Sequence, residues 1–234
     1  MQPEVDPDAG WVARLSGHAP REAARALTEK KGDRDLYRRL ARAHASEGRT
    51  SYIEIDAPRE LLALVRLNRP THVVEVGVSS GVSSAYLLQG LAENGHGTLH
   101  SIDLPSRPRS KTRSTNPSWS LPDGRSSGWA VPMPLRARWD LRLGDKQVVL
   151  PLLAEELDRI DLFVYDVPHE DRTSLREFRT VSRRVPAGGI AIADHGPGGG
   201  LCEALDRWAT LREASPVGRT GLGLYGFRAK TAGP

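Results

Sequence analysis

Residues 71–105 alternate apolar runs with glycine-rich turns in an order that few folds accommodate. A short β-branched run at residues 73–76 is typical of a buried parallel strand. A glycine turn at residues 77–81 follows, then a helical pattern that stops at residues 94–95, and then a second strand that ends on Asp103. This order is typical of nucleotide sites at the edge of a doubly wound sheet: a strand, a glycine turn, a helix, and a second strand that ends in an acid. The segment therefore predicts an α/β fold.

The glycine spacing argues against a dinucleotide site. The fingerprint G-x-G-x-x-G would need glycine at positions 77, 79 and 82, but the chain has Ser79 and Val82. A side chain at position 79 obstructs the place where a pyrophosphate contacts bare backbone. What remains is the pattern Glu75-x-Gly77-x-x-x-Gly81. For this segment alone, an ordinary glycine turn in another α/β protein stays an alternative.

Later segments continue the alternation of strands and turns. Residues 139–145 read as a third strand that closes on Gly144 and Asp145. Residues 160–166 read as a fourth strand that ends in Asp166. A Pro-Ala-Gly-Gly turn and an apolar run ending in Asp194 predict the fifth, and residues 221–227 predict the last strand of an antiparallel hairpin.

These motifs, in this order, resemble those of the class I S-adenosylmethionine-dependent methyltransferases, over about residues 53–228. The groups most similar are the small-molecule O-methyltransferase-like and cephalosporin-hydroxylase-like proteins. The resemblance implies a single doubly wound, seven-stranded, mostly parallel sheet with N-terminal helices. It places a helical extension at residues 1–50 and the cofactor-binding α/β domain at residues 51–234, with a long loop at residues 105–138.

The resemblance also implies S-adenosylmethionine as the cofactor. Glu75 would address the methionine ammonium, directly or through water, and Asp103 would hold the ribose hydroxyls. Asp145 would meet the adenine amine, and the N–H groups of the turn would meet the methionine carboxylate. The expected cofactor-binding residues are Glu75, Gly77, Ser79, Gly81, Asp103, Gly144 and Asp145.

Candidate catalytic and metal-binding residues follow the fourth and fifth strands. In metal-dependent relatives an acid after each of these strands and the residue after the second acid hold a divalent ion, here Asp166, Asp194 and His195. His195 replaces an oxygen ligand, which weakens the case for magnesium and suits a softer metal. His169 and Asp166 are the candidate catalytic residues, because a histidine can act as general base near neutral pH. A histidine that only orders the turn is the alternative.

Composition limits the remaining possibilities. The chain has 234 residues and a net charge of +4, and no run approaches membrane-spanning length. A single cysteine, Cys202, excludes an intramolecular disulfide and suits a cytoplasmic protein. The Pro- and Gly-containing residues 1–20 are expected to be mobile, and residues 21–47 and 58–67 to form helices. Such helices usually cover the cofactor site or make a homodimer contact in the family. Eight cations between Arg21 and Arg42 favour a solvated helical face over a nucleic-acid site.

The loop at residues 105–138 has six prolines, seven serines and no periodicity. From residue 105 to residue 125 it carries five cations against one acid, and it contains Trp119 and Trp129. A flexible surface insertion and a lid that orders over a bound acceptor both fit this composition.

The resemblance implies a methyltransferase that acts on a small-molecule acceptor, most readily an oxygen atom of a specialised metabolite. Two alternatives stay open. One is a metal-dependent oxygenase- or cyclase-like enzyme on the same fold, since fold does not fix chemistry. The other is a noncatalytic RNA-binding protein.

Overall fold

A computed structural model describes residues 7–47, 58–105, 121–122, 124–167, 171–194, 203–218 and 224–231. Of Pro7, Asp171, Arg172, Thr173 and Asp194 it describes the backbone alone. The helices are α1 (Pro7–Ser16), α2 (Pro20–Leu27), α3 (Lys31–Ser46), α4 (Arg59–Asn68), α5 (Val82–Asn94), α6 (Lys146–Glu156), α7 (Asp171–Ser182), α8 (Glu203–Leu211) and the 3-10 helix η2 (Met133–Arg138). The strands are β1 (His72–Val76), β2 (Thr98–Asp103), β3 (Trp139–Leu143), β4 (Leu162–Tyr165), β5 (Ile190–Asp194), β6 (Val217–Gly218) and β7 (Leu224–Arg228).

These strands form one seven-stranded sheet in the order β3-β2-β1-β4-β5-β7-β6. Strands β1 to β5 are parallel, and β7 runs antiparallel to both β5 and β6. The strand order reverses between β1 and β4, which is where doubly wound sheets bind their ligands. The predicted mostly parallel sheet and its C-terminal hairpin are confirmed.

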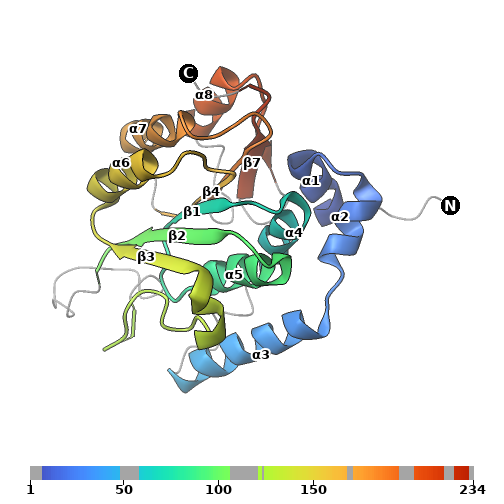
Figure 1. Cartoon of the computed structure of the whole chain (residues 1–234), viewed down its shortest axis with the longest axis vertical. Helices are drawn as coiled ribbons and strands as arrows, with labels where there is room; N and C mark the ends of the chain where they lie inside the picture. The colour runs from blue at the N-terminus through green and yellow to red at the C-terminus, as the bar shows by residue number, and fades with distance from the viewer. Residues whose placement is uncertain are drawn as a thin grey trace.

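Helices cover both faces of the sheet, with α4 and α5 on one side and α6, α7 and α8 on the other (Figure 1). Alternate residues of each strand enter opposite cores, as a period of two requires. Val73 packs in the core that includes α4 and α5, while Val74 and Val76 pack in the core that includes α6 to α8. In the described part of the chain, no helix is both long and apolar enough to span a bilayer.

The expectation that residues 1–20 are mobile is wrong for the described residues. Helix α1 buries Trp11, which is 1% exposed, and the Trp11 indole N–H donates to the Val217 carbonyl at 2.9 Å. Arg228 of β7 donates to the Ser16 carbonyl at 2.7 Å. The N-terminal helix therefore closes the hairpin end of the sheet, and the contact joins residues about two hundred positions apart. A homodimer contact through these helices stays a prediction.

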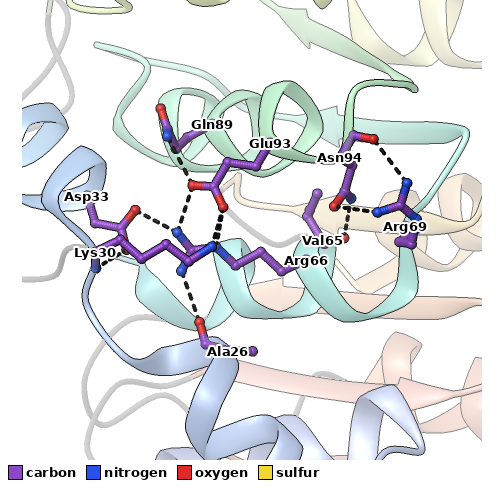
Figure 2. A network of polar contacts seen from close by, with 9 residues as sticks. All are labelled: Ala26, Lys30, Asp33, Val65, Arg66, Arg69, Gln89, Glu93 and Asn94. Atoms are coloured by element: carbon purple, nitrogen blue, oxygen red, sulfur yellow. Dashed lines mark hydrogen bonds and ion pairs between the residues drawn. The ribbon is translucent and has the colours of Figure 1, made fainter.

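Helix α3 is joined to α4 and α5 by ion pairs centred on Arg66 (Figure 2). The Arg66 guanidinium, whose side chain is 9% exposed, lies 2.6 Å from Asp33 and 2.7 Å from Glu93. Lys30 adds a contact of 2.8 Å to Glu93. Burial raises the pKa of Glu93, but hydrogen bonds from Arg66, Lys30 and Gln89 outweigh it and lower the value to about 2.

Polar side chains also link β1, β2 and β3 across the sheet. His72 Nδ1 lies 3.1 Å from His100 Nε2, and His100 Nδ1 lies 3.0 Å from Asp140 Oδ2. Because the Asp140 carboxylate accepts, His100 donates from Nδ1. Burial and the neighbouring His100 lower the pKa of His72.

Candidate active site

Gly77 begins the turn after β1 at the point where three strands end. Its N–H donates to the Ile102 carbonyl of β2 at 2.9 Å, and the Asp166 N–H after β4 donates to the Val76 carbonyl at 2.8 Å. The φ of Gly77 is 96°, and a Cβ there would lie 1.9 Å from the Asp166 carbonyl oxygen. Only glycine fits, because the backbone has a positive φ and touches the next strand's turn. The predicted cofactor turn and the predicted catalytic acid are therefore neighbours.

Asp103 lies directly beside this turn. Its Oδ2 accepts from the Ser79 N–H at 2.9 Å, and its Oδ1 accepts from the Leu104 N–H at 2.8 Å. Ser79 has a φ of 50°, a left-handed value that is uncommon for a residue with a side chain. A carboxylate offers about four lone-pair sites, so two bonds leave roughly two for a ligand. Asp103 thus holds the turn in shape and keeps acceptor capacity.

Gly144 and Asp145 follow β3 next to Asp103. The Gly144 N–H donates to the Asp103 carbonyl at 2.8 Å, which ties the ends of β2 and β3 together. Asp145 is exposed and caps α6, since its side chain accepts from the Gln147 N–H. The predicted ribose acid and the predicted adenine acid therefore lie at adjacent strand ends.

Glu75 differs from the other candidates because it is fully buried. Its Oε1 accepts from Ser83 Oγ at 2.6 Å, and its Oε2 accepts from Ser84 Oγ at 2.6 Å and from Ser101 Oγ at 2.7 Å. Burial raises the pKa of Glu75, and the three hydroxyl donors partly oppose this shift. Trp139 donates to the same Ser101 oxygen at 2.9 Å. Glu75 thus fixes the first turn of α5 against β1 and β2.

Gly81 is covered by a later segment of the chain. Its φ is 91°, and a Cβ there would lie 2.5 Å from Val131 Cγ2 and 2.9 Å from Gly128 Cα. The Gly128 N–H donates to the Ser79 carbonyl at 2.8 Å. Glycine at position 81 is therefore required by contact with the protein itself. The sequence analysis instead expected Gly81 to be a cofactor-binding residue.

The described end of the loop at residues 105–138 is attached to α3. The ring centroids of Trp129 and His44 are 5.0 Å apart, and the Arg125 guanidinium lies 5.2 Å from the Trp129 ring centroid. Arg125 also pairs with Glu47 at 2.5 Å. Trp129 is thus held by the protein's own side chains, and Trp119 lies outside the described residues.

The candidate catalytic and metal residues are described only in part. Asp166 is exposed at the end of β4, and Asp194 ends the neighbouring strand β5, where Ala193 pairs with Tyr165. His169 and His195 lie outside the described residues. Within the described ranges, which omit the Asp194 side chain, no three His, Cys, Asp or Glu residues cluster as metal ligands.

Sequence reasoning missed the serines that hold Glu75. Ser83 and Ser84 lie eight and nine residues after it, on a helix, and Ser101 lies on another strand. No local motif joins these positions. The only usable signal was the acid itself, since a charged residue inside an apolar strand needs partners when buried.

The sequence profile of a methyltransferase domain matches residues 74–195, from β1 to the end of β5 and one residue beyond. The chain belongs to this methyltransferase family. The matched region holds every candidate site residue named above. No protein of curated function matches the chain in sequence.

Solved methyltransferase structures have the same fold. The O-methyltransferase TomG of Streptomyces achromogenes, involved in tomaymycin synthesis and solved with S-adenosylmethionine, is 17% identical, with 88% of this chain and 92% of that chain covered and a TM-score of 0.54. An O-methyltransferase of Bacillus cereus, solved with S-adenosylhomocysteine, is 14% identical, with coverage of 86% and 93% and a TM-score of 0.53. The predicted class I methyltransferase fold is thus confirmed, and neither alternative function is favoured.

Proposed function

We propose that this methyltransferase binds S-adenosylmethionine at the turn after β1 and transfers its methyl group to an oxygen atom of a small-molecule acceptor. The observation that carries the proposal is the meeting of Gly77, Asp103 and Gly144 at the carboxyl edge of β1, β2 and β3, where backbone hydrogen bonds join the three strand ends. The two O-methyltransferases of similar fold, solved with S-adenosylmethionine or S-adenosylhomocysteine, support this choice of cofactor and of acceptor atom.

When bound, the sulfonium supplies an electrophilic methyl group, so the protein mainly has to align the acceptor and remove its proton. Asp103 accepts hydrogen bonds from the ribose hydroxyls. It uses the lone pairs that remain after its two hydrogen bonds from backbone N–H groups. Asp145, exposed beside it, accepts from the adenine amine. Glu75 acts indirectly, because within the described part of the chain its carboxylate accepts from three serine hydroxyls and thereby fixes α5.

The acceptor is deprotonated at the ends of β4 and β5. Asp166 is exposed there and lies against Gly77, so it or His169 takes the acceptor's proton. A divalent ion held by Asp166, Asp194 and His195 would lower the pKa of the acceptor hydroxyl. The exposed Asp166 and the adjacent strand ends fit such an ion, and the nitrogen of His195 fits a transition metal better than magnesium. A specialised metabolite is the proposed acceptor class.

Calorimetric titration with S-adenosylhomocysteine tests the cofactor proposal directly. Wild-type protein should bind saturably, and Asp103→Ala should lose about 1.5–3 kcal/mol of binding free energy, the scale of hydrogen bonds to a charged group. Asp158→Ala is the matched control, since its side chain is 85% exposed and, among the described residues, its ion-pair partner is His72 at 3.8 Å. No heat of binding with wild-type protein, or equal affinities of the two variants, would refute the assignment.

A further inference from the structure

Two arginines of η2 bind main-chain carbonyls near opposite ends of α5. Arg138 donates to the carbonyls of Gly95 at 2.6 Å and Gly97 at 3.4 Å, in the turn that follows α5. Arg136 instead binds a segment that packs against Gly81, the residue before α5. The two side chains make the same kind of contact, but only that of Arg136 lies beside the turn of the proposed cofactor site.

The segment that Arg136 binds, residues 128–131, is the strap over this turn. The Gly128 N–H donates to the Ser79 carbonyl at 2.8 Å, and the Ala130 N–H donates to the Ser80 carbonyl at 3.0 Å. The carbonyl groups of two successive turn residues are therefore fixed by one segment, which comes from a distant part of the chain.

Ser79 is the turn residue that most needs such support. Its φ of 50° is a left-handed value that a residue with a side chain adopts at a cost in free energy. Its N–H donates to the Asp103 carboxylate at 2.9 Å, and its carbonyl accepts from the Gly128 N–H. The proposed ribose acid thus holds one main-chain group of Ser79, and the strap holds the other.

Arg136 joins the two ends of the strap. Its Nε donates to the Val131 carbonyl at 3.1 Å, and its Nη2 donates to the Gly128 carbonyl at 3.0 Å. Its guanidinium also lies 5.6 Å from the centroid of the Trp139 ring. A planar guanidinium can donate to two carbonyls at fixed positions, whereas the single ammonium of a lysine matches such a pair less well. The contacts of Arg136 therefore fix the shape of the strap.

The strand order indicates which part of the proposed cofactor lies at the turn. In the proposed function, Asp145 after β3 takes the adenine and Asp103 at the end of β2 takes the ribose. The next strand is β1, and β4 with Asp166 at its end comes after it. The methionine part, which links the ribose to the reacting methyl group, therefore falls at the turn after β1.

We propose that Arg136 is a positioning residue for the cofactor. Through the strap it holds the turn at residues 77–81 in the shape that binds the methionine part of S-adenosylmethionine. Arg136 acts through the strap rather than by contact with the cofactor. The inference rests on the proposed cofactor site and adds a residue on which the shape of that site depends.

Calorimetry of the full chain with two probes tests this role. S-adenosylhomocysteine carries the amino-acid group, whereas 5′-methylthioadenosine keeps the nucleoside and the sulfur but lacks that group. Arg136→Met should weaken binding of S-adenosylhomocysteine about tenfold, the effect of about one hydrogen bond, and binding of 5′-methylthioadenosine less than about threefold. Arg138→Met is the matched control, because it also removes an arginine that donates to two carbonyls, and it should bind both probes as wild type does.

Arg136→Lys supplies a milder second variant. Its ammonium keeps the charge, so it should lose only about threefold in affinity for S-adenosylhomocysteine and nothing for 5′-methylthioadenosine. Circular dichroism at the titration temperature shows which variants are folded, and Arg136→Lys carries the comparison if Arg136→Met is not.

Two results would overturn the inference and leave the proposed cofactor site intact. One is an affinity for S-adenosylhomocysteine that is the same in the folded Arg136 and Arg138 variants. The other is an equal loss for both probes in the Arg136 variants, which would show a general effect on the fold. Wild-type protein that binds neither probe would instead refute the proposed function, and the inference with it.

Discussion

Replacing Glu75 by alanine and by glutamine tests whether this side chain fixes α5 against the sheet or contacts a cofactor directly. Alanine removes the acceptor of three hydroxyl hydrogen bonds and leaves the hydroxyls of Ser84 and Ser101 buried. Each bond to a charged group contributes about 1.5–3 kcal/mol, but burial of the carboxylate offsets part of the sum. We expect Glu75→Ala to lose about 3–4 kcal/mol of unfolding free energy, at the upper end for single substitutions.

Glutamine keeps the shape of the side chain. Its amide oxygen can accept from two serines, and its amide nitrogen can donate to Ser83 Oγ, so we expect a loss below about 1 kcal/mol. Because burial raises the pKa of Glu75, the folded protein holds this proton more tightly than the unfolded chain does. The stability that wild type has over Glu75→Gln should therefore be greatest below pH 4.5 and fall as the pH rises through that value.

Urea unfolding followed by circular dichroism measures both effects, and calorimetry with S-adenosylhomocysteine measures cofactor affinity for the same proteins. If Glu75 acts by holding α5, Glu75→Gln retains affinity within about threefold, a change of about 0.7 kcal/mol. A folded Glu75→Gln that loses affinity tenfold or more would refute the holding role. It would favour contact with the methionine ammonium instead.

Three further predictions concern other parts of the molecule. Arg66→Met should cost about 3 kcal/mol of unfolding free energy, because it leaves Asp33 buried without its cation, whereas exposed Arg39→Met should cost less than about 0.5 kcal/mol in the same urea experiment. His72 has a lowered pKa, so the unfolded chain binds its proton first, and stability should decline as the pH falls below 6.5; His72→Gln should weaken that decline in thermal unfolding measured across the range. If a divalent ion takes part, a chelator should abolish methyl transfer. Asp194→Ala should also abolish methyl transfer but leave cofactor affinity unchanged. Full turnover in the presence of chelator would instead favour His169 as the base.

Most of the sheet could be predicted from the sequence because its strands are short apolar runs between glycine turns. Strands β1, β2 and β5 begin or end within a few residues of the predicted bounds. Helix α1 was missed because its stability comes from contacts with the hairpin at the other end of the chain, such as Trp11 with Val217. A local sequence pattern rich in Pro and Gly does not predict a contact with such a distant residue.

The helix boundaries near Asp33 show a similar limit. Aspartate often begins a helix, but α3 begins at Lys31, and Asp33, its third residue, accepts from the Lys30 N–H. Its second oxygen pairs with Arg66 on α4. The residue type indicates that a helix starts nearby, but the position of Asp33 within α3 depends on a partner over thirty residues away.

Gly77 and Gly81 were predicted from one motif, yet the structure requires them for two different reasons. At Gly77, the backbone of the turn after β4 occupies the position that a side chain would take. This follows from the parallel pairing of β1 with β4. At Gly81 the obstacle is Gly128 and Val131, which belong to a segment with no recognisable pattern. A substitution at Gly81 therefore has to move residues 128–131 before it affects any ligand. Loss of cofactor affinity in such a variant would report on this packing as much as on the site, which is why Asp103 and Glu75 are the sharper positions for testing the proposed function.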